Sequence, residues 1–205
     1  MNATSPTGFS AFAGDRLLAS GPLAEVAIAV KMAFGQADHV PILIFDDATG
    51  RAIDLDLRGS HRDIIARLPQ PRAAEPETAP EARGRGRPKL GVVSREVTLL
   101  PRHWDWLNAR PGGASVTLRK LVEEARRANA DTDRLRAARD AAYHVMSAMA
   151  GDRPGFEEAS RALFAGDAAR FAELIGAWPA DIRDHLRRQA AVAFGSHAAT
   201  PAAPG

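Results

Sequence analysis

Positive charge and glycine are concentrated in one short stretch of the chain. Residues 82–91, ARGRGRPKLG, contain four basic side chains, three glycines and no acidic residue. Guanidinium and ammonium groups bind phosphate oxygens, and glycine lets the backbone approach a narrow groove. The stretch therefore indicates contact with a polyanion such as nucleic acid.

Within this stretch, RGRPK at 85–89 resembles the AT-hook, a basic motif whose Arg-Gly-Arg-Pro core lies in the minor groove of A·T-rich DNA. Gly84 stands where the motif commonly has proline. The resemblance implies A·T-rich duplex as the partner, because the negative potential of the minor groove is strongest in A-tracts. The DNA-binding residues that it implies are Arg83, Arg85, Gly86, Arg87 and Lys89.

Residues 92–128 are expected to form a strand, a helix, a tight turn and a second helix. Val97 and Leu99 alternate with polar residues, and Pro101 suits the first turn of a helix. A Pro-Gly-Gly sequence ends that helix, and Ser115 suits the N-cap of the next one. In the second helix, apolar residues at i, i+3, i+4 and i+7 form a stripe, and basic residues form the other face. The stripe is Leu118, Leu121, Val122 and Ala125, and the basic face is Arg119, Lys120, Arg126 and Arg127.

This element order resembles the ribbon–helix–helix family of DNA-binding repressors, in which two chains pair their strands into one ribbon that enters the major groove. The resemblance implies a homodimer with Arg95 and Thr98 on or beside the ribbon. It also implies that Ser115 and the neighbouring backbone hold a phosphate, assisted by Arg119 and Lys120. A helix-turn-helix, with residues 115–127 as the recognition helix, remains an alternative. Trp104 and Trp106 are expected to anchor helix packing rather than stack on bases.

Residues 9–68 are expected to form a small α+β unit with the order β-β-α-β-β-α. An Ala-Gly-Asp turn joins two short runs, and Pro22 suits the start of the helix that follows. The PILIF run at 41–45 is typical of a strand covered on both faces, and apolar and acidic residues alternate at 52–57. Ser60 and Asp63 have the spacing of a capping box.

Composition divides the remainder of the chain. Residues 69–82 are rich in Pro, Ala and Glu and are expected to be a flexible linker before the basic arm at 83–91. Residues 83–127 contain 11 basic and 4 acidic side chains, a net charge of +7 within a chain of net charge +2. Residues 131–194 have helical periodicity and are expected to pack as a bundle, and residues 195–205 are expected to be a disordered tail.

Residue patterns of the known catalytic motifs do not occur in this sequence. It contains no cysteine, no nucleophile elbow, no phosphate loop and no dinucleotide fingerprint. The six histidines have no metal-ligand spacing, and His144 and His185 are expected at the edge of the core or on the surface. Four aspartates offer oxygens to a hard cation, but strand alternation and turn preference explain them as structural: Asp46, Asp47, Asp54 and Asp56. We therefore predict no enzyme activity, no cofactor and no bound metal.

Three longer strings, GRPKLGVVSREVTLLPRHWDWL, GGASVTLRKLVEEAR and PGFEEASRALFAGD, resemble an uncharacterised bacterial family, domain of unknown function 2239. The resemblance implies a bacterial origin and a shared architecture, but no activity.

Taken as a whole, the sequence predicts an α+β protein that binds A·T-rich DNA and acts in transcription regulation. The first residues lack the features of a signal peptide, and charged residues interrupt the longest apolar stretch. A cytoplasmic protein without membrane contact is therefore expected. The alternatives are binding of RNA by the basic segment and a protein-interaction scaffold, in which the helical bundle binds a partner.

Overall fold

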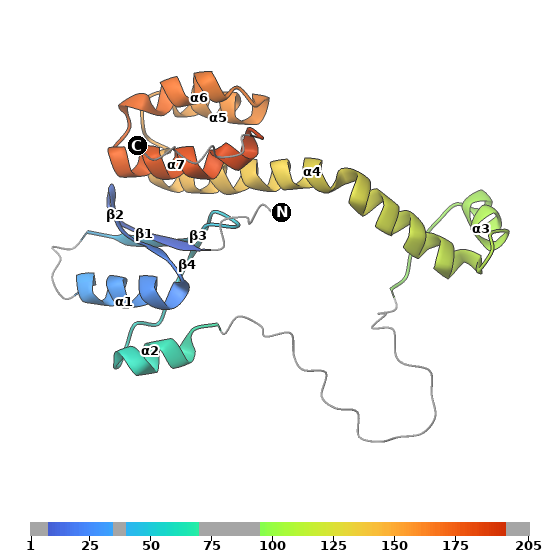
Figure 1. The fold of residues 1–205 in the computed structure, drawn as a ribbon, viewed down its shortest axis with the longest axis horizontal. Coiled ribbons are helices and arrows are strands. Elements are labelled where there is room, and N and C mark those ends of the chain that lie inside the picture. Colours follow the sequence, from blue (N-terminus) through green and yellow to red (C-terminus); the bar gives the residue numbers. More distant parts are fainter. Residues whose placement is uncertain (1–7, 35–39, 70–94, 196–205) are drawn as a thin grey trace, which may run out of the picture. The chain divides into compact units, whose positions relative to one another are not determined.

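The computed structural model describes residues 8–34, 40–69 and 95–195. The N-terminal part contains four strands and two helices, in the predicted order (Figure 1). Their bounds are β1 Phe9–Ala13, β2 Arg16–Gly21, α1 Leu23–Phe34, β3 Ile42–Asp46, β4 Arg51–Ile53 and α2 His61–Arg67. The remainder is helical: α3 Pro101–Asn108, α4 Gly113–Ala150, α5 Phe156–Ala165, α6 Ala168–Leu174, the 3-10 turn η1 Ile175–Ala177 and α7 Ala180–Ala193. The predicted α+β class is confirmed.

The four strands form one antiparallel sheet in the order β2-β1-β3-β4. The ladder of β4 ends at Ile53, earlier than the alternation at 52–57 predicts. Leu55 and Leu57 nevertheless remain half-buried against the same cluster as Ile53, and Asp54 and Asp56 are exposed. The alternation thus correctly predicts which side chains turn inward, although the strand itself is shorter.

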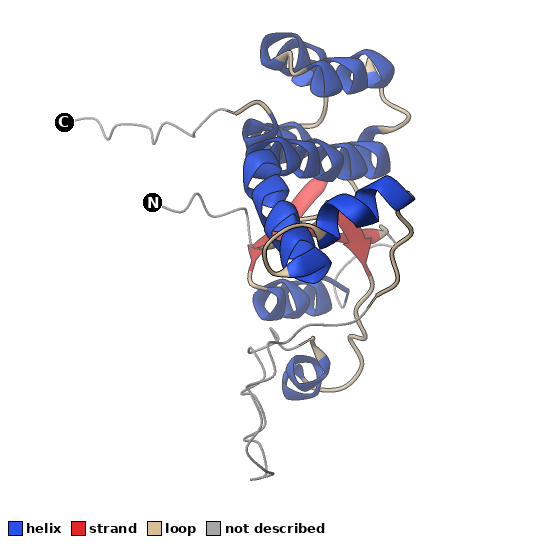
Figure 2. Ribbon diagram, turned by 90° about the vertical axis from the view of Figure 1, so that its right-hand side faces the viewer, coloured by secondary structure: helices blue, strands red, loops and turns tan. Residues whose placement is uncertain are grey.

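The chain divides into two compact units, residues 1–68 with 131–205 and residues 69–130. In the first, called the sheet unit here, helices cover both faces of the sheet (Figures 1 and 2). Ala11 and Ile44 pack with Val26 and Val30 of α1 on one face. Alternate residues of the same strands, including Phe12, face the helical bundle on the other.

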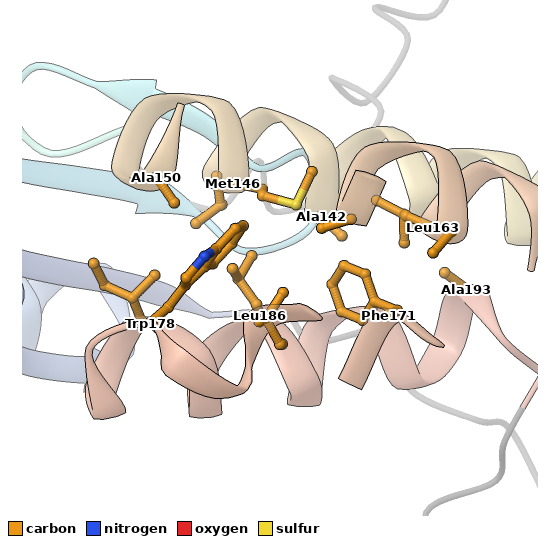
Figure 3. Packing of buried hydrophobic residues seen from close by; sticks show 14 of the residues in the cluster. Ala142, Met146, Ala150, Leu163, Phe171, Trp178, Leu186 and Ala193 are labelled. Atoms are coloured by element: carbon orange, nitrogen blue, oxygen red, sulfur yellow. The ribbon is translucent and has the colours of Figure 1, made fainter. Parts of the chain in front are cut away.

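The bundle of the sheet unit consists of α5, α6, α7 and residues 131–150 of α4. Figure 3 shows Trp178, Leu186 and Phe171 pointing toward Met146 and its neighbours on α4. All of these side chains are at most 4% exposed, so the bundle and the sheet share a closed apolar core. The predicted bundle is therefore formed, and its core extends onto the sheet.

Helix α4 is continuous over 38 residues and belongs to both units. The sequence predicts helix on each side of residues 129–130, and the structure joins the two stretches because no glycine or proline interrupts them. Exposed i, i+3 and i, i+4 ion pairs support the junction, each contributing about 0.3–0.5 kcal/mol. They are Arg126 and Arg127 with Glu123, Arg134 with Asp131, and Arg136 with Asp133. Within the described ranges, no helix has the length and apolar character needed to cross a membrane.

Candidate nucleic-acid interface and a buried polar pocket

The sequence-predicted DNA-binding residues fall into two groups. Arg83, Arg85, Gly86, Arg87 and Lys89, which form the basic arm, lie outside the described residues. The other five all lie in the described part of the second unit, called the basic unit here: Arg95, Thr98, Ser115, Arg119 and Lys120.

Arg95 and Thr98 are exposed and belong to a segment without regular secondary structure. The strand predicted around Val97 and Leu99 is therefore wrong for the single chain. A strand needs a neighbour to accept and donate its backbone hydrogen bonds. Within the described ranges, β1 to β4 pair only with one another, and none pairs with residues 95–100.

Ser115 lies inside the first turn of α4 rather than at its N-cap. The helix begins at Gly113, whose amide donates to the carbonyl of Arg110 at 2.9 Å. The predicted cap at Ser115 is therefore wrong, since the Pro-Gly-Gly turn leads directly into the helix. Ser115 and Arg119 are four residues apart and share one exposed face, and Lys120 follows on the next position.

Several cations of the basic unit point into solvent. Arg95, Arg102, Arg119 and Lys120 are exposed, and none forms an ion pair with a carboxylate of the described residues. The ion pairs seen in residues 95–130 are both to Glu123. The four cations are thus open to an external anion, as phosphate binding requires.

The basic unit also exposes several apolar side chains. On the stripe of α4, Leu121 is 40% and Val122 is 64% exposed, and Val97 and Leu100 precede α3 with 55% and 49%. The predicted packing role of Trp106 is wrong, because the residue is 46% exposed and its ring centroid lies 4.2 Å from the Arg110 guanidinium carbon. Of residues 95–130, Leu107 is the one buried apolar side chain. In a single chain, residues 95–130 therefore form no apolar core of their own.

A second site, which sequence reasoning missed, lies in the sheet unit between β1 and α7. Ser10, Asp47, His185 and Gln189 are all at most 9% exposed, with Arg188 at the rim. The Ser10 hydroxyl donates to Asp47 Oδ2 at 3.1 Å and lies 3.2 Å from Ser20 Oγ. These residues line a pocket of about 170 Å³.

Three buried polar atoms of residues that line this pocket have no hydrogen-bond partner among the described residues: Asp47 Oδ1, His185 Nε2 and Gln189 Oε1. Asp47 Oδ1 and His185 Nε2 are 4.0 Å apart, too far for a hydrogen bond. The pocket contains a serine, a histidine and an aspartate, but Asp47 lies between the other two. No serine–histidine hydrogen bond is present among the described residues, so a hydrolytic triad is not formed.

Burial perturbs both titratable groups of the pocket. Desolvation lowers the pKa of His185 from 6.5 to about 4, and the charge of Arg188 acts in the same direction. Desolvation also raises the pKa of Asp47, and the hydrogen bond from Ser10 opposes part of that rise. His185 is therefore a neutral ring at neutral pH, and the expectation that it lies at the core edge or surface is wrong.

The other three aspartates of the predicted structural cluster are accounted for by local contacts. Asp46 accepts hydrogen bonds from the amide of Ala48 and the hydroxyl of Thr49 in the turn after β3. Asp56 pairs with Arg58, and Asp54 is exposed. Among the described residues, no group of three metal-ligating side chains comes together.

One sequence signal could have pointed to the polar pocket. The buried stripe of α7 contains apolar residues at i, i+4, i+8 and i+11, with His185 and Gln189 on the same face. Two polar side chains four residues apart on a core-facing stripe must satisfy their hydrogen bonds inside the protein or bind something.

No curated protein and no solved structure matches this chain. A family model does match, over residues 8–190, and it covers both units and both sites. The chain belongs to this family, described as an uncharacterized protein conserved in bacteria, domain of unknown function 2239.

Proposed function

We propose that this protein binds A·T-rich DNA through its basic unit and acts in transcription regulation. The observation that carries the proposal is the set of four exposed cations, Arg95, Arg102, Arg119 and Lys120, without an ion pair to a described carboxylate. Cations neutralised by the protein's own carboxylates would gain little from phosphate, whereas open ones release counterions from DNA when they bind.

The charge distribution along the chain supports the same function. The net charge of +7 on residues 83–127 lies between flanks of net charge −4 and −1. In the proposed complex Arg85 and Arg87 follow the floor of the minor groove, and Arg119 and Lys120 contact backbone phosphates. The arm then supplies the preference for A·T base pairs, and the helix supplies affinity that does not depend on sequence.

A homodimer is part of this proposal. Leu121 and Val122 are exposed on α4, and Val97 and Leu100 are exposed in the segment before α3. A second copy would bury these side chains and would give residues 95–100 the strand neighbour that they lack in one chain. Two basic units would also double the number of phosphate contacts.

DNA binding is tested by fluorescence anisotropy with an A·T-rich and a G·C-rich duplex over a series of salt concentrations. If about four phosphates are neutralised by each chain, log affinity falls with log salt at a slope of about −3.6 per bound chain, and about twice that for a bound dimer. Arg119→Ala/Lys120→Ala should reduce that slope to about −1.8 on both duplexes. Arg85→Ala/Arg87→Ala should instead remove the preference for the A·T-rich duplex.

The matched control is Arg161→Ala/Arg170→Ala, which removes two exposed arginines of the sheet unit. This variant should bind as the wild type does. Equal affinity of the wild type and Arg119→Ala/Lys120→Ala at low salt would refute the assignment to α4. Absence of binding by the wild type would favour the protein-interaction scaffold.

The dimer is tested by sedimentation equilibrium of the full chain. Wild type should sediment with twice the mass of the chain, and Leu121→Glu/Val122→Glu should sediment as a monomer because buried charges oppose the contact. The control is Met32→Glu, at a side chain of the sheet unit that is 58% exposed. A monomeric wild type at all concentrations would contradict the dimer.

A further inference from the structure

The polar pocket of the sheet unit is lined by buried polar side chains whose hydrogen-bonding capacity is not fully used. His185 and Gln189 both line the pocket, are each 95% buried, and each have a side-chain polar atom without a hydrogen-bond partner among the described residues. Leaving a buried polar atom without a hydrogen bond costs about 1–3 kcal/mol. A bound molecule that donated hydrogen bonds to these three atoms would remove this cost.

The three unpartnered atoms call for hydrogen-bond donors. The orientation of Gln189 is fixed, because its Nε2 donates to the carbonyl of Asp47 at 3.1 Å and its Oε1 therefore accepts. Asp47 Oδ1 accepts, and the neutral ring of His185 accepts at Nε2 when Nδ1 carries the proton. A water molecule supplies two donors, whereas an ammonium group supplies three and a charge opposite to that of Asp47.

The mouth of the pocket carries the opposite charge. Arg188 is exposed, lines the pocket and forms no ion pair with a described carboxylate. A guanidinium group in this position suits a carboxylate, which it binds with two parallel hydrogen bonds. A ligand that spans the pocket would meet acceptors inside and a cation at the rim.

We propose that this pocket binds a small zwitterionic amino acid, with its ammonium group on Asp47, His185 and Gln189 and its carboxylate on Arg188. The pocket volume of about 170 Å³ exceeds the roughly 30 Å³ that one water occupies and leaves space for a short side chain. The proposal concerns the sheet unit alone and does not depend on DNA binding by the basic unit.

The test is calorimetric titration of the full chain with glycine, L-alanine and L-serine, with two half-ligands of alanine as controls. Ethylamine keeps the ammonium group and propionate keeps the carboxylate. At least one amino acid should bind with a millimolar or lower Kd. Each half-ligand should bind about 10- to 100-fold more weakly, because it lacks one set of charge-assisted hydrogen bonds. Ethylamine binding as tightly as L-alanine would overturn the role of Arg188.

Two variants locate the site. Asp47→Asn keeps the shape of the side chain and should weaken binding about 10- to 100-fold. Arg188→Gln should reduce the affinity for the amino acid to that for ethylamine. Arg187 is exposed, adjacent in sequence and outside the pocket, so Arg187→Gln is the control and should leave the affinity unchanged.

Arg188 is exposed, so Arg188→Gln is expected to fold even if Asp47→Asn does not. In that case the binding measured for Arg188→Gln tests whether the amino acid occupies this pocket. No binding of any of the three amino acids to the wild type, with only ordered water in the pocket, would overturn the proposal. Unchanged binding by Arg188→Gln would overturn it as well.

Discussion

Replacing His185 with leucine should remove a large part of the acid sensitivity of this protein. In the folded chain the pKa of His185 is about 4, below its usual 6.5, because burial opposes the charged ring. As the pH falls below 6.5, the unfolded chain takes up a proton at this position and the folded chain does not. The free energy of unfolding therefore decreases between pH 6.5 and pH 4 and changes no further through this group below that window.

The size of the effect follows from the two pKa values. A separation of about 2.5 pH units corresponds to about 3.4 kcal/mol over the whole window, of which about 2.5 kcal/mol is lost by pH 4.5. Asp47 and Arg188 face the ring. The raised pKa of Asp47 acts in the opposite direction, because the folded chain then binds a proton before the unfolded chain does. The free energy of unfolding that the wild type loses by pH 4.5 should therefore be at most about 2.5 kcal/mol.

The assay is urea unfolding followed by circular dichroism at pH 7.0, 5.5 and 4.5, with the slope m compared between variants. His185→Leu should lose about 2.5 kcal/mol less than the wild type between pH 7.0 and 4.5. His61→Gln, at an exposed histidine, serves as the control and should follow the wild type. The reasoning is refuted if His185→Leu and the wild type lose the same stability over this range.

Two further predictions concern packing in the sheet unit. Gly50→Ala should cost about 3 kcal/mol or more, because φ at Gly50 is +64° and an added Cβ would lie 1.9 Å from the carbonyl oxygen of Ala141. Gly176→Ala, where an added Cβ meets no atom within 4 Å, should stay within about 0.5 kcal/mol of wild type, and both are measured by urea unfolding at pH 7. Leu186→Ala should cost about 2–5 kcal/mol, since Leu186 is fully buried in the apolar core of the sheet unit, and a loss below about 1 kcal/mol would contradict the described core. Phe164→Ala, at a residue that is 47% exposed, should cost clearly less in the same urea experiment.

Local patterns were enough to predict the elements of the N-terminal part. Pro22 precedes α1 directly, and the ILIF residues of the PILIF run lie in β3, with both faces covered. Ser60 and Asp63 form the predicted capping box, with both reciprocal hydrogen bonds present. These features depend on residues close together in the chain, so the sequence alone contains the information that they need.

The errors arise where the outcome depends on distant parts of the chain or on a second chain. Val97 and Leu99 have strand periodicity, but a strand forms only beside a partner. The polar pocket combines Ser10 of β1, Asp47 after β3 and His185 of α7, and no spacing in the sequence relates the three. Each of them looked ordinary in its own segment, and only the packing of α7 on the sheet brings them together.

Burial of the sheet by the last helix has a consequence for synthesis on the ribosome. The amide of Leu17 in β2 bonds to the carboxylate of Asp181 at the start of α7, 164 residues later. At about 5–20 residues per second, the amide of Leu17 waits roughly 8–33 s for Asp181 to be translated. During this interval Phe12 and Phe45 have no cover from α7, so newly made chains should depend on chaperones more than finished ones do.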